Sequence, residues 1–171
     1  PVNMILKPDL LLERANARTE TVIDKPVRSP WVFGDLKPAE VTASSIQIRW
    51  PNARYELRWD KSQQRYLIYF AGEANLAASG EHLYADTAIV QLVSITPSIY
   101  GDKFGGVTPF SKTTGSGKAI LFRDGMSFEL TWQRDRPEDV TTWSYLNGEV
   151  AKFKAGRIWV FLTDQEPVIT P

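Results

Sequence analysis

The feature that most limits how this chain can fold is an alternation of apolar and polar residues with a period of two. Ile46, Ile48 and Trp50 alternate with polar neighbours, and residues 54–60 repeat the pattern after a turn at residues 51–53. Successive side chains of a β-strand point to opposite faces, so this pattern predicts strands that are buried on one side. The two runs with their intervening turn predict a β-hairpin.

Short apolar runs separated by turn residues continue to the end of the chain. Asp124-Gly125 and Asn147-Gly148 are dipeptides typical of tight hairpin turns. The run 87–96 is rich in β-branched residues and predicts the most buried strand. The sequence therefore predicts a mainly β fold, an antiparallel sandwich or a strongly bent sheet of short strands, and the further strands are expected at residues 65–71, 87–96, 107–113, 118–123, 126–133, 141–146, 149–153 and 157–163.

The first 38 residues have a different pattern. A proline at position 8, an early acid at Asp9 and a later base at Arg14 predict one short N-terminal helix. Prolines recur through residues 19–38, where a helix is not expected. That stretch is interpreted as an extended linker, with the aromatic residues of the run 31–33 as its packing anchor.

Composition excludes several functions. The 20 basic and 20 acidic residues balance, which is not typical of a nucleic-acid-binding protein. Without cysteine, and with His82 as the single histidine, a thiolate nucleophile, a sulfur-ligated zinc site and an all-histidine metal site are excluded, and no cofactor is predicted. No run approaches the roughly 20 apolar residues of a membrane-spanning helix. The chain begins at Pro1 rather than methionine, which indicates a trimmed or processed fragment.

Two polar groupings are candidates for chemistry or binding. His82 with Asp86 could form a general base and its orienting partner, although no convincing nucleophile accompanies them. Surface histidines beside acids are common, so a purely structural role stays open for both. Asp102 and Lys103 lie in a glycine-bearing segment, residues 98–106, which is expected to be a flexible loop and is a candidate binding surface.

The six tryptophans offer a third kind of candidate, an aromatic platform for a sugar ring. Trp31 and Trp143 have less regular surroundings and are the better candidates for exposure and ligand contact, with packing in the core as the open alternative. The other four fall on the inward-facing positions of the alternation and are expected in the core: Trp50, Trp59, Trp132 and Trp159.

Beyond these patterns, several motifs occur in a fixed order along residues 46–163. The sequence resembles the carboxy-terminal domain of the DUF3048 family, the YerB-like bacterial lipoproteins, most specifically in the tryptophan of the run 130–133 and the glycine-x-x-tryptophan of the run 156–159. The motifs that carry the resemblance are residues 55–60 (Tyr-Glu-Leu-Arg-Trp-Asp), 65–67, 87–91, 115–119, 124–125, 130–133, 147–149 and 155–160.

The resemblance implies an organisation and a location. Residues 1–38 would be the tail of a preceding amino-terminal domain with a linker, and residues 39–171 the β-rich carboxy-terminal domain. The protein would be extracytoplasmic and anchored to the membrane only through a lipid outside this fragment. The family carries no catalytic residues that could be transferred to this chain.

Three functional hypotheses follow. The first is a noncatalytic binding or interaction module for an envelope protein or glycan. The second is a hydrolase or transferase acting on envelope polymers, with a site around His82, Asp86 and the segment 98–106 that is shared with the protein's own amino-terminal domain. The third is a structural spacer that positions that domain.

Overall fold

The computed structural model describes residues 7–18, 29–35 and 41–171. The predicted helix is present as α1 (Pro8–Asn16), with proline in its first turn, Asp9 near its amino end and Arg14 in its last turn. These charges suit the helix dipole. None of the helical residues is buried, and Leu10, Leu11 and Leu12 are exposed. No described helix is long and apolar enough to cross a membrane.

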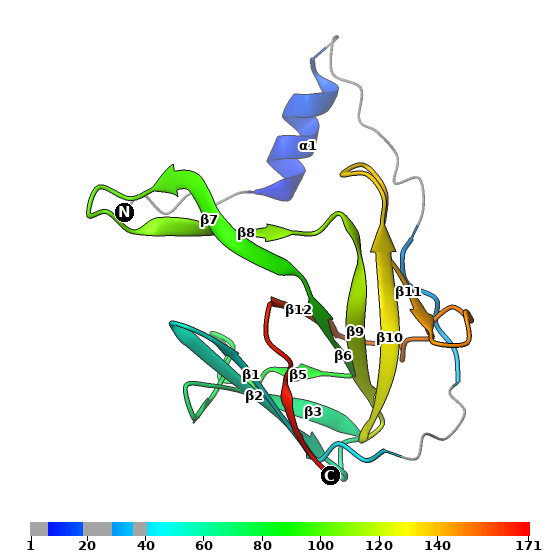
Figure 1. Cartoon of the computed structure of the whole chain (residues 1–171). Helices are drawn as coiled ribbons and strands as arrows, with labels where there is room; N and C mark the ends of the chain where they lie inside the picture. Colours follow the sequence, from blue (N-terminus) through cyan, green and yellow to red (C-terminus); the bar gives the residue numbers. More distant parts are fainter. Residues whose placement is uncertain (1–6, 19–28, 36–40) are drawn as a thin grey trace.

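Two sheets form the body of the β domain (Figure 1). The first sheet has the order β13-β1-β2-β3-β4, with β5 also paired to β3. All its pairs are antiparallel, and β1 and β2 form the predicted hairpin, with Trp50 opposite Ala53 beside the turn. Its strands are β1 (Ser45–Trp50), β2 (Ala53–Asp60), β3 (Arg65–Phe70), β4 (Glu73–Ala74), β5 (Tyr84–Ala85) and β13 (Val168–Thr170).

The second sheet has the order β11-β10-β9-β6-β12. Strands β9 and β10 form the predicted hairpin, and Asp124 and Gly125 in its turn have φ angles of 55° and 74°. Two consecutive positive φ angles are those of a type I′ turn. One pair departs from antiparallel order, because β12 runs parallel to β6. The strands are β6 (Thr87–Leu92), β9 (Gly115–Arg123), β10 (Met126–Arg134), β11 (Thr142–Tyr145) and β12 (Ile158–Thr163).

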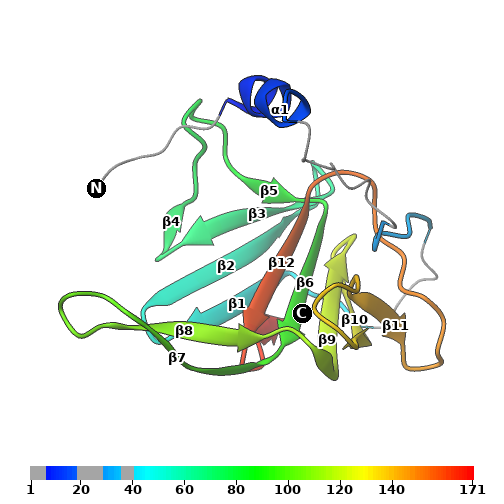
Figure 2. The same cartoon turned by 90° about the horizontal axis from the view of Figure 1, so that it is seen from above.

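A separate two-stranded ribbon, here called the arm, is formed by β7 (Ser94–Gly101) and β8 (Val107–Lys112). In both orientations it extends away from the two sheets (Figures 1 and 2). The prediction of a single strand over residues 87–96 is therefore wrong in part, because β6 ends at Leu92 and the chain leaves the sheet there. The flexible loop expected at residues 98–106 is also shorter than predicted, because β7 continues to Gly101.

The core has two parts, and the predicted mainly β fold of antiparallel sheets with one short helix is confirmed. One cluster lies between the two sheets and includes Ile46, Leu57 and Ile68 from the first sheet with Val90 and Phe122 from the second. A second cluster includes Ile89, Leu121, Leu130, Trp132 and Phe153. Because neighbouring strand residues face opposite ways, the second cluster covers the outer face of the second sheet. Strand β6 is consequently buried on both faces, which agrees with the prediction that the most buried strand begins at residue 87.

Candidate functional site

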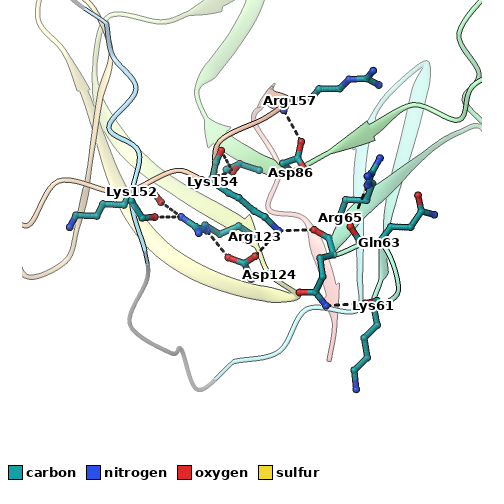
Figure 3. A network of polar contacts seen from close by, with 12 residues as sticks. Lys61, Gln63, Arg65, Asp86, Arg123, Asp124, Lys152, Lys154 and Arg157 are labelled. Atoms are coloured by element: carbon teal, nitrogen blue, oxygen red, sulfur yellow. Dashed lines mark hydrogen bonds and ion pairs between the residues drawn. The ribbon is translucent and has the colours of Figure 1, made fainter.

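The predicted acid–base pair is not formed. The Nε2 atom of His82 lies 2.8 Å from the carbonyl oxygen of Ile68, and its ring packs edge-on against Tyr69 with centroids 4.9 Å apart. The carboxylate of Asp86 instead accepts a hydrogen bond of 2.8 Å from the backbone N–H of Arg157 (Figure 3). Each side chain thus has its own backbone partner, so the arrangement gives the histidine no orienting carboxylate.

Asp86 has a structural role at the entrance to β12. Gly156 lies against it with a φ of 133°, and a Cβ atom at that position would be 2.1 Å from Oδ2 of Asp86. Only glycine fits so close to the carboxylate in this backbone conformation. The contact explains why the glycine-x-x-tryptophan motif begins where the chain turns into β12.

A charged network lies close to Asp86, between the two sheets and the segment 29–35 (Figure 3). Arg123, whose side chain is buried, donates from Nε to Asp124 at 2.8 Å and from Nη1 to the carbonyl oxygens of Gly34 at 2.8 Å and Lys152 at 3.1 Å. Lys154 donates from Nζ to Asp124 at 3.0 Å and to the carbonyl oxygen of Gln64 at 2.8 Å. The network therefore connects the β9–β10 turn with the segment 29–35, the segment 152–154 and the β2–β3 turn.

The pKa of Asp124 reflects a competition within this network. Partial burial acts to raise the pKa of its carboxyl, and hydrogen bonds from Lys154 and Arg123 act to lower it. The hydrogen bonds prevail, so the pKa lies below the ordinary value. Asp124 is thus held ionised as an acceptor between two cations, which suits a structural ion pair rather than a general acid.

The expectation that Trp143 is exposed is wrong. Its side chain is only 5% exposed, and its indole N–H donates to Oε1 of Gln91 at 3.1 Å. Trp31 stacks on it with ring centroids 5.2 Å apart and also meets Phe153 edge-on. The two candidate sugar-binding rings therefore cover each other.

The segment 29–35 brings Trp31 into this position. Phe33 forms a parallel bridge with Phe153, and backbone hydrogen bonds join Gly34 and Val32 to the same residue. The predicted aromatic anchor is thereby confirmed, and it packs directly on the outer core of the second sheet.

Asp102 and Lys103 lie in the turn of the arm. Oδ1 of Asp102 accepts hydrogen bonds from the backbone N–H groups of Phe104 at 2.8 Å and Gly106 at 2.9 Å, so this carboxylate shapes the turn. Lys103 is exposed, with Nζ 5.0 Å from the centre of the Phe104 ring. Binding by these two residues stays a prediction.

The sequence reasoning missed the most unusual property of the arm, which is its exposed apolar side chains. Ile99 is 94% exposed, Phe104 85% and Tyr100 71%, and Val107 and Phe110 are exposed as well. The available signal was the run 99–104, in which large apolar residues lie beside glycines rather than in alternation with polar residues.

A groove lies where the arm leaves the body, between β7, β8 and the β1–β2 turn. It has a volume of about 570 Å³. The indole N–H of Trp50 donates to the carbonyl oxygen of Leu162 at 2.9 Å, which fixes the ring of that residue. The lining is mostly apolar and comprises Trp50, Pro51, Asn52, Ala53, Ile95, Thr96, Pro97, Val107, Pro109, Ser111 and Asp164.

Within residues 7–18, 29–35 and 41–171, no three side chains of histidine, aspartate or glutamate are grouped so that they could hold a metal ion. The groove contributes a single carboxylate, that of Asp164. The rest of its lining is mostly apolar, with a few polar groups.

Comparisons with known proteins agree with this architecture. The chain is similar to a crystal structure of the YerB protein from Bacillus subtilis, with a TM-score of 0.69 and 15% sequence identity. The match covers 96% of this chain and 53% of the YerB chain, so this chain spans about half the length of that protein, and the likeness shows the fold alone. Curated proteins gave no match. The family model for the DUF3048 C-terminal domain, a domain of unknown function, matches residues 46–160. The chain therefore belongs to the DUF3048 family and contains its C-terminal domain.

Proposed function

We propose that this domain is a noncatalytic interaction module of an extracytoplasmic, lipid-anchored protein, and that it binds an extended segment of an envelope protein in the groove at the base of the arm. The location is supported by the resemblance to bacterial lipoproteins. The observation that carries the binding role is the groove itself, an apolar hollow of about 570 Å³ with polar groups at its margin. Such hollows are the usual sites of ligand recognition.

The polar side chains support binding rather than catalysis. His82 and Asp86 each contact backbone groups, and the charged network of Arg123, Asp124 and Lys154 joins structural elements to one another. A hydrolase or transferase needs a nucleophile or activated water aligned with a base. The described residues provide no such alignment around His82.

A protein partner suits the groove better than a glycan. Glycan platforms present an open aromatic face, whereas the two tryptophans expected to do so stack on each other. In the groove, Trp50 packs against Tyr55 and Phe161. Ile95, Pro97 and Val107 then provide apolar contacts for side chains of a peptide, and Asp164 provides one carboxylate for a basic residue or a backbone N–H.

Selection from a displayed random-peptide library would test the proposal. Val107→Lys places a charge in the groove, and Val168→Lys is its matched control, because both valines are 57% exposed and only Val107 lines the groove. We expect selected peptides to bind the unmodified domain and Val168→Lys alike and to bind Val107→Lys at least about tenfold more weakly. Failure to select any peptide, or equal binding by all three proteins, would count against the groove.

A further inference from the structure

We propose that the tip of the arm, residues 99–106, inserts into the interfacial region of a phospholipid bilayer. This would give the domain a direct contact with lipid, in addition to any anchor elsewhere in the protein. The inference concerns a different surface from the groove, so either proposal can fail without the other.

The apolar side chains of the tip are arranged as a projection. Ile99, Tyr100 and Phe104 occupy its end and expose most of their surface, and the arm carries them away from the body (Figures 1 and 2). Side chains this exposed gain free energy only when something apolar surrounds them. Tyrosine in addition suits the boundary between headgroups and acyl chains, because its ring is apolar and its hydroxyl is polar.

Several backbone N–H groups of the tip already have hydrogen-bond partners within the arm, which suits an apolar environment. Asp102 accepts the N–H groups of Phe104 and Gly106 through its side chain, and its own N–H donates to the carbonyl oxygen of Gly106. The N–H of Gly105 donates to the carbonyl oxygen of Asp102, and that of Tyr100 to Ser98 Oγ. Backbone groups without partners are costly in a bilayer, so a tip that satisfies them internally loses less on insertion.

The charges of the arm are compatible with lipid headgroups. Lys103 lies at the tip and Lys112 at the base, and the single acid of the arm, Asp102, is engaged with the backbone N–H groups of the turn. A lysine beside inserted apolar residues can extend its ammonium group to a lipid phosphate. This arrangement predicts a modest preference for anionic lipid.

The alternative of adding a strand from another protein is disfavoured by two prolines. Pro97 and Pro109 are partners across the arm. Each lacks a backbone N–H, and proline on an exposed strand is a common way in which proteins block strand addition. The arm therefore offers its apolar tip rather than its backbone edges.

Because the chain has no cysteine, a single introduced cysteine can report insertion directly. We would label Phe104→Cys with an environment-sensitive fluorophore and add vesicles of phosphatidylglycerol and phosphatidylcholine. The control label at Asn147→Cys lies in the turn after β11. We expect a blue shift and increased emission for the label at position 104 and none at position 147. Equal responses at both positions, or none at either, would overturn the proposal.

Vesicle co-sedimentation gives a second, independent test. Burying one large apolar side chain is worth about one to two powers of ten in binding, so Ile99→Ser and Phe104→Ser should each weaken vesicle binding about tenfold or more. Leu146→Ser is the matched control, because Leu146 is a large apolar residue that is 71% exposed but lies outside the arm. Equal loss in all three variants, or complete loss of binding at about 0.5 M salt, where charge attraction is screened, would refute insertion.

Discussion

Replacement of Arg123 by methionine should weaken the domain more than any exposed charge substitution, because this side chain is only 6% exposed and joins three partners. Methionine keeps most of the aliphatic volume and removes the guanidinium. The lost hydrogen bonds lead to Asp124 at 2.8 Å, Gly34 O at 2.8 Å and Lys152 O at 3.1 Å. Two carbonyl oxygens lose a charged donor, and Asp124 keeps only Lys154 of its two cationic partners.

The size of the effect follows from these contacts. Breaking a fully buried ion pair costs roughly 3–5 kcal/mol, but Asp124 is 34% exposed and water can partly replace the lost donor. We therefore expect the free energy of unfolding to fall by about 2–4 kcal/mol. For a chain of 171 residues this corresponds to a decrease in melting temperature of about 4–16 °C.

Urea unfolding and calorimetry would measure the loss, with Arg136→Met as the control. Arg136 also pairs with an aspartate, Asp139, but its side chain is 74% exposed, so its removal should cost less than about 1 kcal/mol. Hydrogen exchange adds a local readout, because the N–H groups of Gly34 and Phe153 bond across the junction that Arg123 supports. The reasoning is refuted if Arg123→Met and Arg136→Met have equal stability and the exchange at Gly34 is unchanged.

Two further predictions concern the same region. The lowered pKa of Asp124 means that its stabilising contribution is complete above roughly pH 4, the ordinary pKa of an aspartate, and is lost as the pH falls through the lowered value. Asp124→Asn should accordingly be less stable than the unmodified protein in urea unfolding at pH 7, with the difference shrinking below about pH 4; a difference that is constant from pH 7 to pH 3 would contradict this. Gly156→Ala should cost about 2–4 kcal/mol in thermal unfolding, because the new Cβ meets Asp86 in a backbone conformation that disfavours side chains. Gly148→Ala also has a positive φ, 86°, but has open space, so it should cost about 1–2 kcal/mol, and equal losses would show that the Asp86 contact is unimportant.

Much of the fold could be predicted because most of its strands and tight turns are marked by patterns of residues adjacent in sequence. Alternation located β1 and β2, and the Asp124-Gly125 dipeptide located the β9–β10 turn, since both depend on residues adjacent in sequence. The parallel pairing of β6 and β12 joins residues about 70 positions apart. The residues of neither strand indicate which strand it pairs with or whether the pairing is parallel, so this pair could not be predicted from the sequence.

The candidate site was less predictable, because burial depends on distant segments. Trp143 has irregular neighbours in sequence, and what buries it is Trp31, together with Phe153 and Gln91. His82 and Asp86 are four residues apart, which invites pairing, but a strand places their side chains beside different backbone groups. Proximity in sequence is therefore a poor guide to side-chain pairing where the chain is extended.

The arm shows the converse problem: its large apolar residues would be assigned to the core from the sequence, but the structure leaves them exposed. A strand segment with isoleucine, tyrosine and phenylalanine reads the same whether a second layer covers it or not. Coverage is decided where β7 leaves the second sheet after Leu92, and from that point the described residues supply no further layer for Ile99 or Phe104. An isolated two-stranded ribbon is only marginally stable in water. A partner bound in the groove and a bilayer around the tip, as proposed above, would each stabilise this ribbon by covering its apolar side chains.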